Sequence, residues 1–370
     1  MVKRFFTVII VLILGVSCSS SSDDSPEGGG KDNFDRGVVL INLADNIIIP
    51  SLQDLNSKLE DLNSKKDIFI ATPNQENLDN LRTSWLAAYK VWQYVEMHNI
   101  GKAEEILYYF QMNIYPTNTA DIEENISSGN YDLTHVNNND AVGFPALDYM
   151  LYGLGVNDDA EILVKYTTNA DAANYKTYLS DVVVQMKNLT ETVLNDWTSS
   201  YRTTFIGSTS NTASSAYNKL VNDFIFYYEK GLRANKIGTP AGNFSTNPLP
   251  DRVEALYNKE ASKVLALEAL KATQDFFNGK KYNGNTEDKG YNSHLQSLNK
   301  ENLGNLVNSQ FNTARQKIND LEDSFYNQIN TDNTKVTQAY DALQLNVVSL
   351  KVDMLQAFNI SVDYVDADGD

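Results

Sequence analysis

Histidine and cysteine are scarce in this chain of 370 residues, which has three histidines and one cysteine. The histidines, His98, His135 and His294, are too far apart in sequence for two of them to hold zinc from one helix face. The chain also has no Gly-x-Ser-x-Gly nucleophile motif and no glycine-rich loop of the phosphate-binding type. The residues alone therefore assign no catalytic group.

Segments that alternate apolar and polar residues are also missing, which argues against β-strands. Apolar residues instead recur every three or four positions, most clearly at 78–95, 172–197, 307–325 and 336–354. Such spacing predicts amphipathic helices that pack against one another, so we expect an all-α protein. A further helix is expected from about Val253 to Phe277, and a Ser/Thr-rich loop from Thr198 to Ser210.

Positive charge is in short supply, because 30 Lys and Arg residues face 48 Asp and Glu residues. The formal net charge of −18 repels nucleic acid and anionic lipid headgroups, so we expect no nucleic-acid partner. Diffuse acidity does not oppose cations, although it commonly serves solubility.

The first residues have the pattern of a bacterial export signal. Lys3 and Arg4 precede the apolar run 5–16, which is too short to span a bilayer as a mature helix. Small residues then lead to Cys18, as in a lipoprotein box. We therefore predict a signal peptide at 1–17 and lipidation of Cys18.

Residues 19–32 consist largely of Ser, Asp and Gly and contain no bulky apolar side chain. Such a segment cannot bury enough surface to offset its ordering cost, so 18–32 should form a lipidated flexible tether. We expect a protein of the bacterial cell envelope, anchored to the outer membrane on its periplasmic or surface face. The membrane is then a partner through the lipid.

A helix start is predicted within the stretch from Val142 to Leu154. Gly143 and Pro145 are typical of a first helical turn, and Asp148 follows three residues after the proline, on the same face. The carboxylate can serve a cap or an ion pair, or belong to a binding site.

A second polar pattern, Arg82-x-x-Trp85 followed by Glu96, lies on an apolar-striped helix. Arg82 and Glu96 are separated by about 20 Å along that helix, so they cannot pair directly. Glu96 can instead meet Asp148, provided that a cation, a proton or an arginine offsets the two carboxylates. For Trp85 the alternative is core packing, and for Arg82 and Glu96 it is structural ion pairing.

These two segments and the run Lys-Ile-Gly-x-Pro-x-Gly at 236–242 resemble the imelysin-like proteins. This bacterial family was once described as insulin-cleaving metallopeptidases, and several members are linked to iron uptake. In its Gly-x-His-x-x-Glu motif, Pro145 stands here at the histidine and Asp148 at the glutamate. Proline can neither bind a metal nor carry a proton, so this departure argues against metal-dependent catalysis.

The resemblance implies two packed helical-bundle domains, at 33–200 and 201–370, with an acidic tail at the end. It implies a site at their interface, formed by Gly143, Pro145, Asp148, Arg82, Trp85 and Glu96. Iron or another divalent cation is the implied cofactor, with Glu96 and Asp148 as candidate ligands. A metal ion or small ligand and other uptake components are the implied partners. The 236–242 run either caps a helix or lines the cleft.

The leading hypothesis is a non-catalytic binding lipoprotein associated with the uptake of iron or another small ligand. One alternative is a metallopeptidase of the imelysin type, and another is a structural or interaction module with a degenerated site. The tail at 363–370 lacks the twelfth-position glutamate of an EF-hand and should be solvated rather than bind calcium.

Overall fold

The computed structural model describes residues 34–155 and 158–364, all within one compact unit, Asp32–Asp370. The predicted signal peptide, Cys18, the tether and residues 365–370 of the tail lie outside the described residues. The described ranges contain helices and turns but no β-strand, apart from an isolated bridge between Lys280 and Glu287. The all-α prediction is confirmed.

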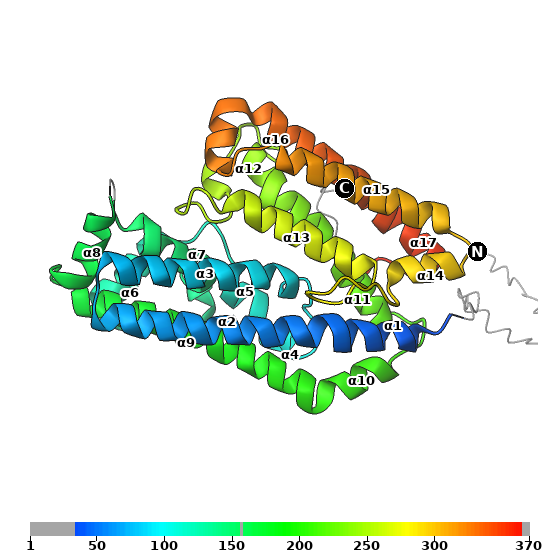
Figure 1. Cartoon of the computed structure of the whole chain (residues 1–370), viewed down its shortest axis with the longest axis horizontal. Helices are drawn as coiled ribbons and strands as arrows, with labels where there is room; N and C mark the ends of the chain where they lie inside the picture. The colour runs from blue at the N-terminus through cyan, green and yellow to red at the C-terminus, as the bar shows by residue number, and fades with distance from the viewer. Residues whose placement is uncertain (1–33, 156–157, 365–370) are drawn as a thin grey trace, which may run out of the picture. The chain divides into compact units, whose positions relative to one another are not determined.

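The first half is built on three long helices. α2 (Ile49–Ala71) packs along both α3 (Gln75–Val95) and α9 (Ala172–Asp196), as Figure 1 shows. The chain enters α2 through α1 (Arg36–Leu43) and the π-helical segment η1 (Ala44–Ile48). The π turn lies directly before the first turn of α2, which contains a proline and so lacks one amide donor.

The apolar stripe of α3 is fully buried, as its spacing predicts. Leu78, Leu81, Trp85, Ala88 and Trp92 each have 0% of their surface exposed. Short elements connect α3 to α9: α4 (Lys102–Glu105), α5 (Tyr108–Met112), α6 (Thr119–Ser128), η2 (Val136–Asn138), α7 (Gly143–Asp148), η3 (Tyr149–Gly153) and α8 (Asp159–Thr167).

After α9 the chain stays helical through η4 (Trp197–Tyr201) and α10 (Arg202–Gly207). The predicted loop from Thr198 to Ser210 is therefore wrong over most of its length. Its aromatic side chains explain the difference, because Trp197 and Phe205 are buried and pack edge to face with ring centroids 5.1 Å apart. This apolar contact outweighs the low helix propensity of the surrounding Ser and Thr residues.

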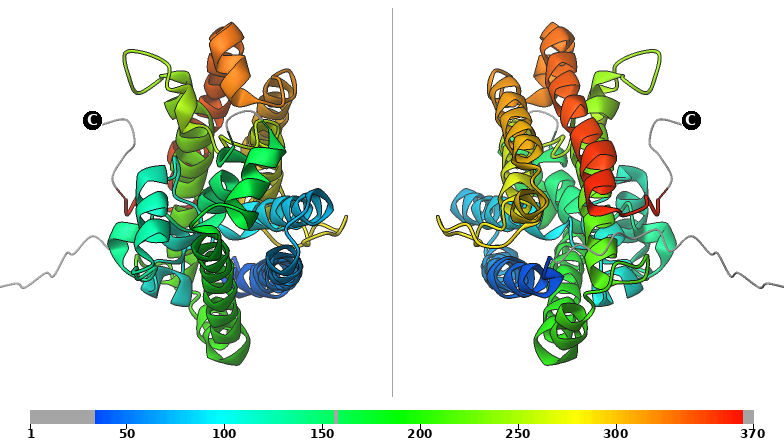
Figure 2. Two further views of the ribbon diagram at one scale, coloured as in Figure 1. Left: turned by 90° about the vertical axis from the view of Figure 1, so that its left-hand side faces the viewer. Right: turned by 90° about the vertical axis from the view of Figure 1, so that its right-hand side faces the viewer.

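The second half contains α11 (Ala216–Phe226), η5 (Tyr227–Gly238), α12 (Thr239–Ala241), η6 (Pro250–Arg252), α13 (Ser262–Phe277), α14 (Tyr291–Ser297), α15 (Glu301–Asn319), α16 (Phe325–Val348), η7 (Ser349–Met354) and α17 (Leu355–Phe358). α15 and α16 pack together, and both end views in Figure 2 show them side by side. α13 contacts both α15 and α3, so it joins the two halves. The domain boundary near residue 200 stays a prediction.

Helix α13 begins nine residues later than predicted, at Ser262 rather than near Val253. Residues 253–261 form turns and bends instead. The hydroxyl of Ser262 donates a hydrogen bond to the carbonyl oxygen of Glu254 at 2.7 Å, which stabilises this irregular path.

The π-helical segment η5 continues directly from α11 and is twelve residues long. Most π-helical segments are single turns, and they are frequent at functional sites. Its buried polar side chains lie in two groups, Tyr227 with Lys236 and Glu229 with Arg233. η5 therefore contributes buried charged side chains to both groups.

By length and composition, the helical stretch Arg36–Ala71 could cross a membrane. In the structure, 56% of its most apolar window is buried. The stretch accordingly serves as a core helix of the compact unit.

Candidate functional site

The segment that carries the family-like motif is fixed at its first residue by backbone packing. Gly143 has φ +74°, and a Cβ atom there would lie 2.2 Å from the carbonyl oxygen of Met112. Only glycine allows this approach. Pro145 is buried in the first turn of α7.

The next residue, Phe144, connects α7 to α3 by a hydrogen bond and by ring stacking. Its carbonyl oxygen accepts a hydrogen bond from Nε1 of Trp85 at 3.1 Å. Its ring stacks on Tyr89 with centroids 4.4 Å apart. Trp85 therefore combines core packing with one specific hydrogen bond between the two helices.

Asp148 is buried at the end of α7 and binds backbone rather than another side chain. Its two carboxylate oxygens accept hydrogen bonds from the amides of Tyr257 and Asn258, both at 2.8 Å. Burial raises the pKa of Asp148 to about 7, against the opposing effect of these two amides. Asp148 thus holds the irregular segment 253–261 in place. No hydrogen bond joins it to Glu96 within the described residues.

Arg82 belongs to a different part of α3. Its Nη1 and Nη2 lie 2.8 and 2.7 Å from the carboxylate oxygens of Asp159, and its Nη2 also donates to the carbonyl of Leu151 at 2.7 Å. The guanidinium carbon lies 4.4 Å from the ring centroid of Tyr152. These contacts tie α3 to η3 and α8, so structural ion pairing accounts for Arg82.

Glu96 lies in a buried charged cluster at the C-terminal end of α3. Nζ of Lys236 lies 2.9 Å from Oε1 of Glu96 and 2.8 Å from each carboxylate oxygen of Glu254. The side chains of these three residues are each 2% exposed. Burial opposes the charged ammonium, but Glu254 and Glu96 raise the pKa of Lys236 above its ordinary value. We call Glu96, Lys236 and Glu254 the buried triad.

Neutral donors complete the hydrogen bonding of the triad. The hydroxyl of Tyr227 donates to Glu96 at 2.6 Å, and Nε1 of Trp92 donates to its other oxygen at 2.8 Å. Nδ2 of Asn113 lies 3.0 Å from both Glu96 and Glu254 and bridges the carboxylates. Both carboxylates are therefore paired and hydrogen-bonded, as buried charges must be.

The pairing partners of Glu96 were not found from the sequence. Glu96 faces Glu254 rather than Asp148, and the offsetting cation is a lysine. Lys236 is the first residue of the 236–242 run, so this motif could have indicated a buried lysine. A cation at this position is equally typical of a helix end. Glu254 lies in a segment that was predicted to be helical.

The donor set does not fit an iron or zinc centre. The ammonium of Lys236 lies between the two carboxylates where a cation would bind, and Pro145 supplies no ligand. Residues 34–155 and 158–364 contain no group of three or more His, Cys, Asp or Glu side chains placed to hold a metal ion. Of the two candidate ligands, Glu96 binds Lys236, and Asp148 binds two backbone amides.

Two pockets share Arg252 in their lining, and the smaller of them also includes Asn113, which contacts the triad. The smaller, of about 150 Å³, is lined by Arg252 and by Tyr109, Asn113, Ile114, Tyr115, Asn235 and Thr239. The larger, of about 550 Å³, is lined by Arg252 and by Pro116, Pro248, Leu249, Pro250, Asp251, Leu256 and Tyr257. We call the two together the Arg252 cleft. Its Asn113 contacts the buried triad, and its Tyr257 is held by Asp148.

Two polar groups of the Arg252 cleft have no protein partner within the described residues. Arg252 is exposed and makes no ion pair or side-chain hydrogen bond there, and the hydroxyl of Tyr115 makes no hydrogen bond. Burial and the nearby Glu254 raise the pKa of Tyr115 well above its ordinary value, so the hydroxyl stays a donor. Thr239, from the 236–242 run, lines the smaller pocket, and Gly242 of the same run is the left-handed C-cap of α12.

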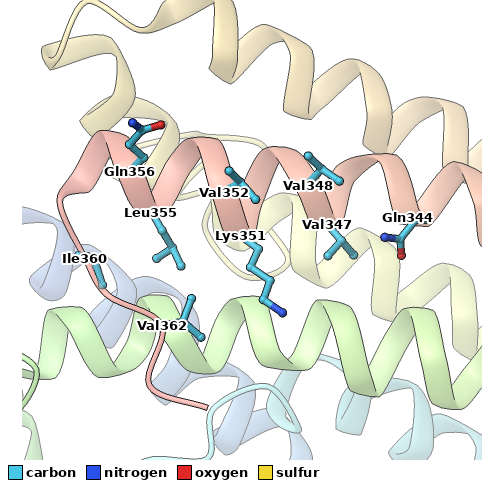
Figure 3. Close-up of a pocket in the computed structure, with 9 residues that line it drawn as sticks. All are labelled: Gln344, Val347, Val348, Lys351, Val352, Leu355, Gln356, Ile360 and Val362. Carbon is cyan, nitrogen blue, oxygen red and sulfur yellow. The ribbon is translucent and has the colours of Figure 1, made fainter. Parts of the chain in front are cut away.

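A separate hollow of about 490 Å³, the α16 groove, lies along α16 and η7 (Figure 3). It is lined by Gln344, Val347, Val348, Lys351, Val352, Leu355, Gln356, Ile360 and Val362. Lys351 extends from it to η5, where its Nζ lies 3.0 Å from the carboxylate of the fully buried Glu229. Lys351, the cation of this groove, thus serves an internal ion pair.

Comparisons with known proteins agree with this architecture. A model of the family described as Peptidase_M75: Imelysin matches residues 48–354. A solved structure from Parabacteroides distasonis ATCC 8503, described provisionally as an iron-regulated protein A precursor, is 20% identical with a TM-score of 0.72; the match covers 90% of this chain and 97% of that one. For an imelysin-like protein from Psychrobacter arcticum 273-4 the values are 17%, 0.69, 90% and 99%. No curated protein matches the chain.

Proposed function

Since this chain belongs to the imelysin family, as its sequence motifs predicted, we propose that it is a non-catalytic binding lipoprotein of the bacterial envelope. The Arg252 cleft takes a small ligand, and complexed iron is the first candidate. The observation that carries the proposal is the buried triad, in which a lysine occupies the place between two carboxylates that a metal would need. The ligand is therefore recognised by the neighbouring Arg252 cleft and not by the triad.

Metal-dependent peptide hydrolysis needs a bound water and a general base within reach of it. In this chain Glu96 and Glu254 are both committed to Lys236, and Asp148 is committed to two amides. None of the three presents a free carboxylate to the cleft. These commitments support binding rather than peptidase activity.

The proposed place of action is the outer membrane, with Cys18 lipidated and residues 19–32 as the tether. Other uptake components would be the partners. The name of the Parabacteroides relative links that protein to iron, and it supports iron as the first ligand to test here. Iron would bind in the cleft as a complex and not as a bare ion, because Lys236 already occupies the cation position between the two carboxylates of the triad.

The chain from Ser19 onward contains the whole compact unit Asp32–Asp370 and is the form to test. Thr239→Trp should fill the smaller pocket, whereas Val352→Trp adds the same ring to the α16 groove as a matched control. In equilibrium dialysis with radiolabelled ferric citrate, we expect Thr239→Trp to bind about tenfold more weakly, a change of roughly 1.4 kcal/mol. The control should bind like the unmodified chain.

Equal binding by all three forms would move the site away from the Arg252 cleft. Absence of binding in the unmodified chain would remove complexed iron as the ligand. Zinc-dependent cleavage of casein by the purified chain would overturn the non-catalytic proposal.

A further inference from the structure

Arg252 lines both pockets of the cleft, and it has no carboxylate within ion-pairing distance in the described residues. An unpaired arginine is notable in a chain with a net charge of −18. Its planar fork of N–H donors matches a carboxylate in bidentate geometry. From this arrangement we infer that the ligand is a small organic carboxylate whose charged end binds Arg252. The inference rests on the proposed function, since it names the ligand class of the same cleft.

The smaller pocket supplies further donors on one side of Arg252. The Tyr115 hydroxyl is unpartnered within the described part of the chain, and it stays protonated beside the buried triad. Thr239 adds a second hydroxyl to the pocket wall. The smaller pocket therefore offers two neutral hydroxyl donors in addition to the guanidinium of Arg252.

The larger pocket supplies the apolar surface. Pro250, Leu256 and Tyr257 line it, and its volume of about 550 Å³ is within the usual range for small-molecule sites. Inorganic phosphate would leave this surface uncovered, whereas a ring attached to a carboxylate would cover it. The ligand class is thus an organic anion rather than a simple inorganic one.

The nearby negative charges limit how much anionic charge the cleft can accept. Asp251 lines the larger pocket, and the buried triad combines two carboxylates with one ammonium. Like charges in proximity disfavour one another, so the cleft suits a monocarboxylate, or a carboxylate ligand whose further charge is neutralised by a bound metal, better than a free multiply charged anion. Removing the negative charge of Asp251 should therefore change the affinity for a carboxylate in the opposite direction to removing the positive charge of Arg252.

Isothermal titration calorimetry with benzoate and benzylamine tests the charge preference, because the two probes share a ring and differ in charge. We expect benzoate to bind the unmodified chain and to bind more tightly than benzylamine or inorganic phosphate. Arg252→Gln should weaken benzoate about tenfold or more, the usual effect of losing a hydrogen bond to a charged group. Asp251→Asn should leave benzoate unchanged or tighten it. Lys259→Gln, an exposed cation outside both pockets, is the matched control.

Three results would overturn the inference: no benzoate binding, preference for benzylamine, or benzoate binding that Arg252→Gln leaves intact. If Thr239→Trp blocks ferric citrate while Arg252→Gln leaves benzoate unaffected, the proposed function stands and the carboxylate anchor fails. If benzoate binds through Arg252 but the chain cleaves casein, the anchor stands and the non-catalytic proposal fails.

Discussion

Glu96, the C-cap of α3, and Lys236 of η5 form a buried ion pair with 2.9 Å between Oε1 and Nζ, although they are 140 residues apart in sequence. The pair connects helices of the two predicted domains. Glu254 completes the triad from an irregular segment held by Asp148. A buried ion pair contributes little net stability, but removing one partner leaves an uncompensated charge in the core. The triad is therefore sensitive to substitution, and the adjoining cleft depends on it.

Lys236→Met should destabilise the fold by about 3–5 kcal/mol, because two buried carboxylates would lose their cation. Urea unfolding followed by circular dichroism measures the change. Adding Glu254→Gln to Lys236→Met should restore part of the loss, since one unpaired charge is removed. Lys102→Met, which breaks an exposed pair with Glu105, should have almost no effect. A neutral result for Lys236→Met would mean that the triad is not charged as described.

Asp148→Asn should change how stability depends on pH. Burial raises the pKa of Asp148 from 3.8 to about 7, so between these values the folded state retains a proton that the unfolded state releases. This contribution to stability is complete below about pH 4 and is lost as the pH rises through about 7, by at most about 1.4 kcal/mol per pH unit. The free energy of unfolding should therefore fall with pH more steeply in the unmodified chain than in Asp148→Asn.

Asp223 has the same sign of effect, because burial raises its pKa to about 8. Asp223 is present in both proteins, so its effect cancels when the pH profile of the unmodified chain is compared with that of Asp148→Asn. Parallel pH profiles for the two proteins between pH 4.5 and 8 would contradict the assignment to Asp148.

Gly143→Ala should be strongly destabilising because it combines two costs. The φ of +74° costs an L-residue about 1–3 kcal/mol, and the new Cβ would lie 2.2 Å from the Met112 carbonyl oxygen. Relief of that contact adds an overpacking cost of about 1–3 kcal/mol. Gly207→Ala is the control, since a Cβ there meets no atom within 4 Å. Similar melting temperatures for both variants would refute the close approach.

Arg82→Gln should lower stability without changing ligand affinity. It removes the paired contacts with Asp159 and the hydrogen bonds to the Leu151 carbonyl, at a cost of about 1.5–3 kcal/mol. Because Arg82 lines neither pocket of the Arg252 cleft, the benzoate affinity of the folded variant should equal that of the unmodified chain. A weaker benzoate affinity at temperatures where the variant is folded would show that Arg82 contributes to the binding site.

Much of the fold follows from local signals. The apolar stripe of α3 predicts a buried helix face, and Gly143 with Pro145 predicts the start of α7, because both are properties of short stretches of chain. The wrong helix start near Val253 has a tertiary cause. Residues 253–261 have a pattern compatible with a helix, but the amides of Tyr257 and Asn258 bind a carboxylate more than 100 residues away. Local propensity is a weak preference that such contacts override.

The sequence by itself determined an all-α chain of the imelysin family, the burial of Trp85, and the absence of an imidazole at Pro145. Only the tertiary structure decided that Lys236 pairs with Glu96 and Glu254, that Asp148 holds a loop, and that Arg252 lines two pockets. Periodicity and motifs report on neighbours along one helix. The pairing of buried charges depends instead on which segments meet after folding, because a charge in the core must take its partner from whatever packs against it.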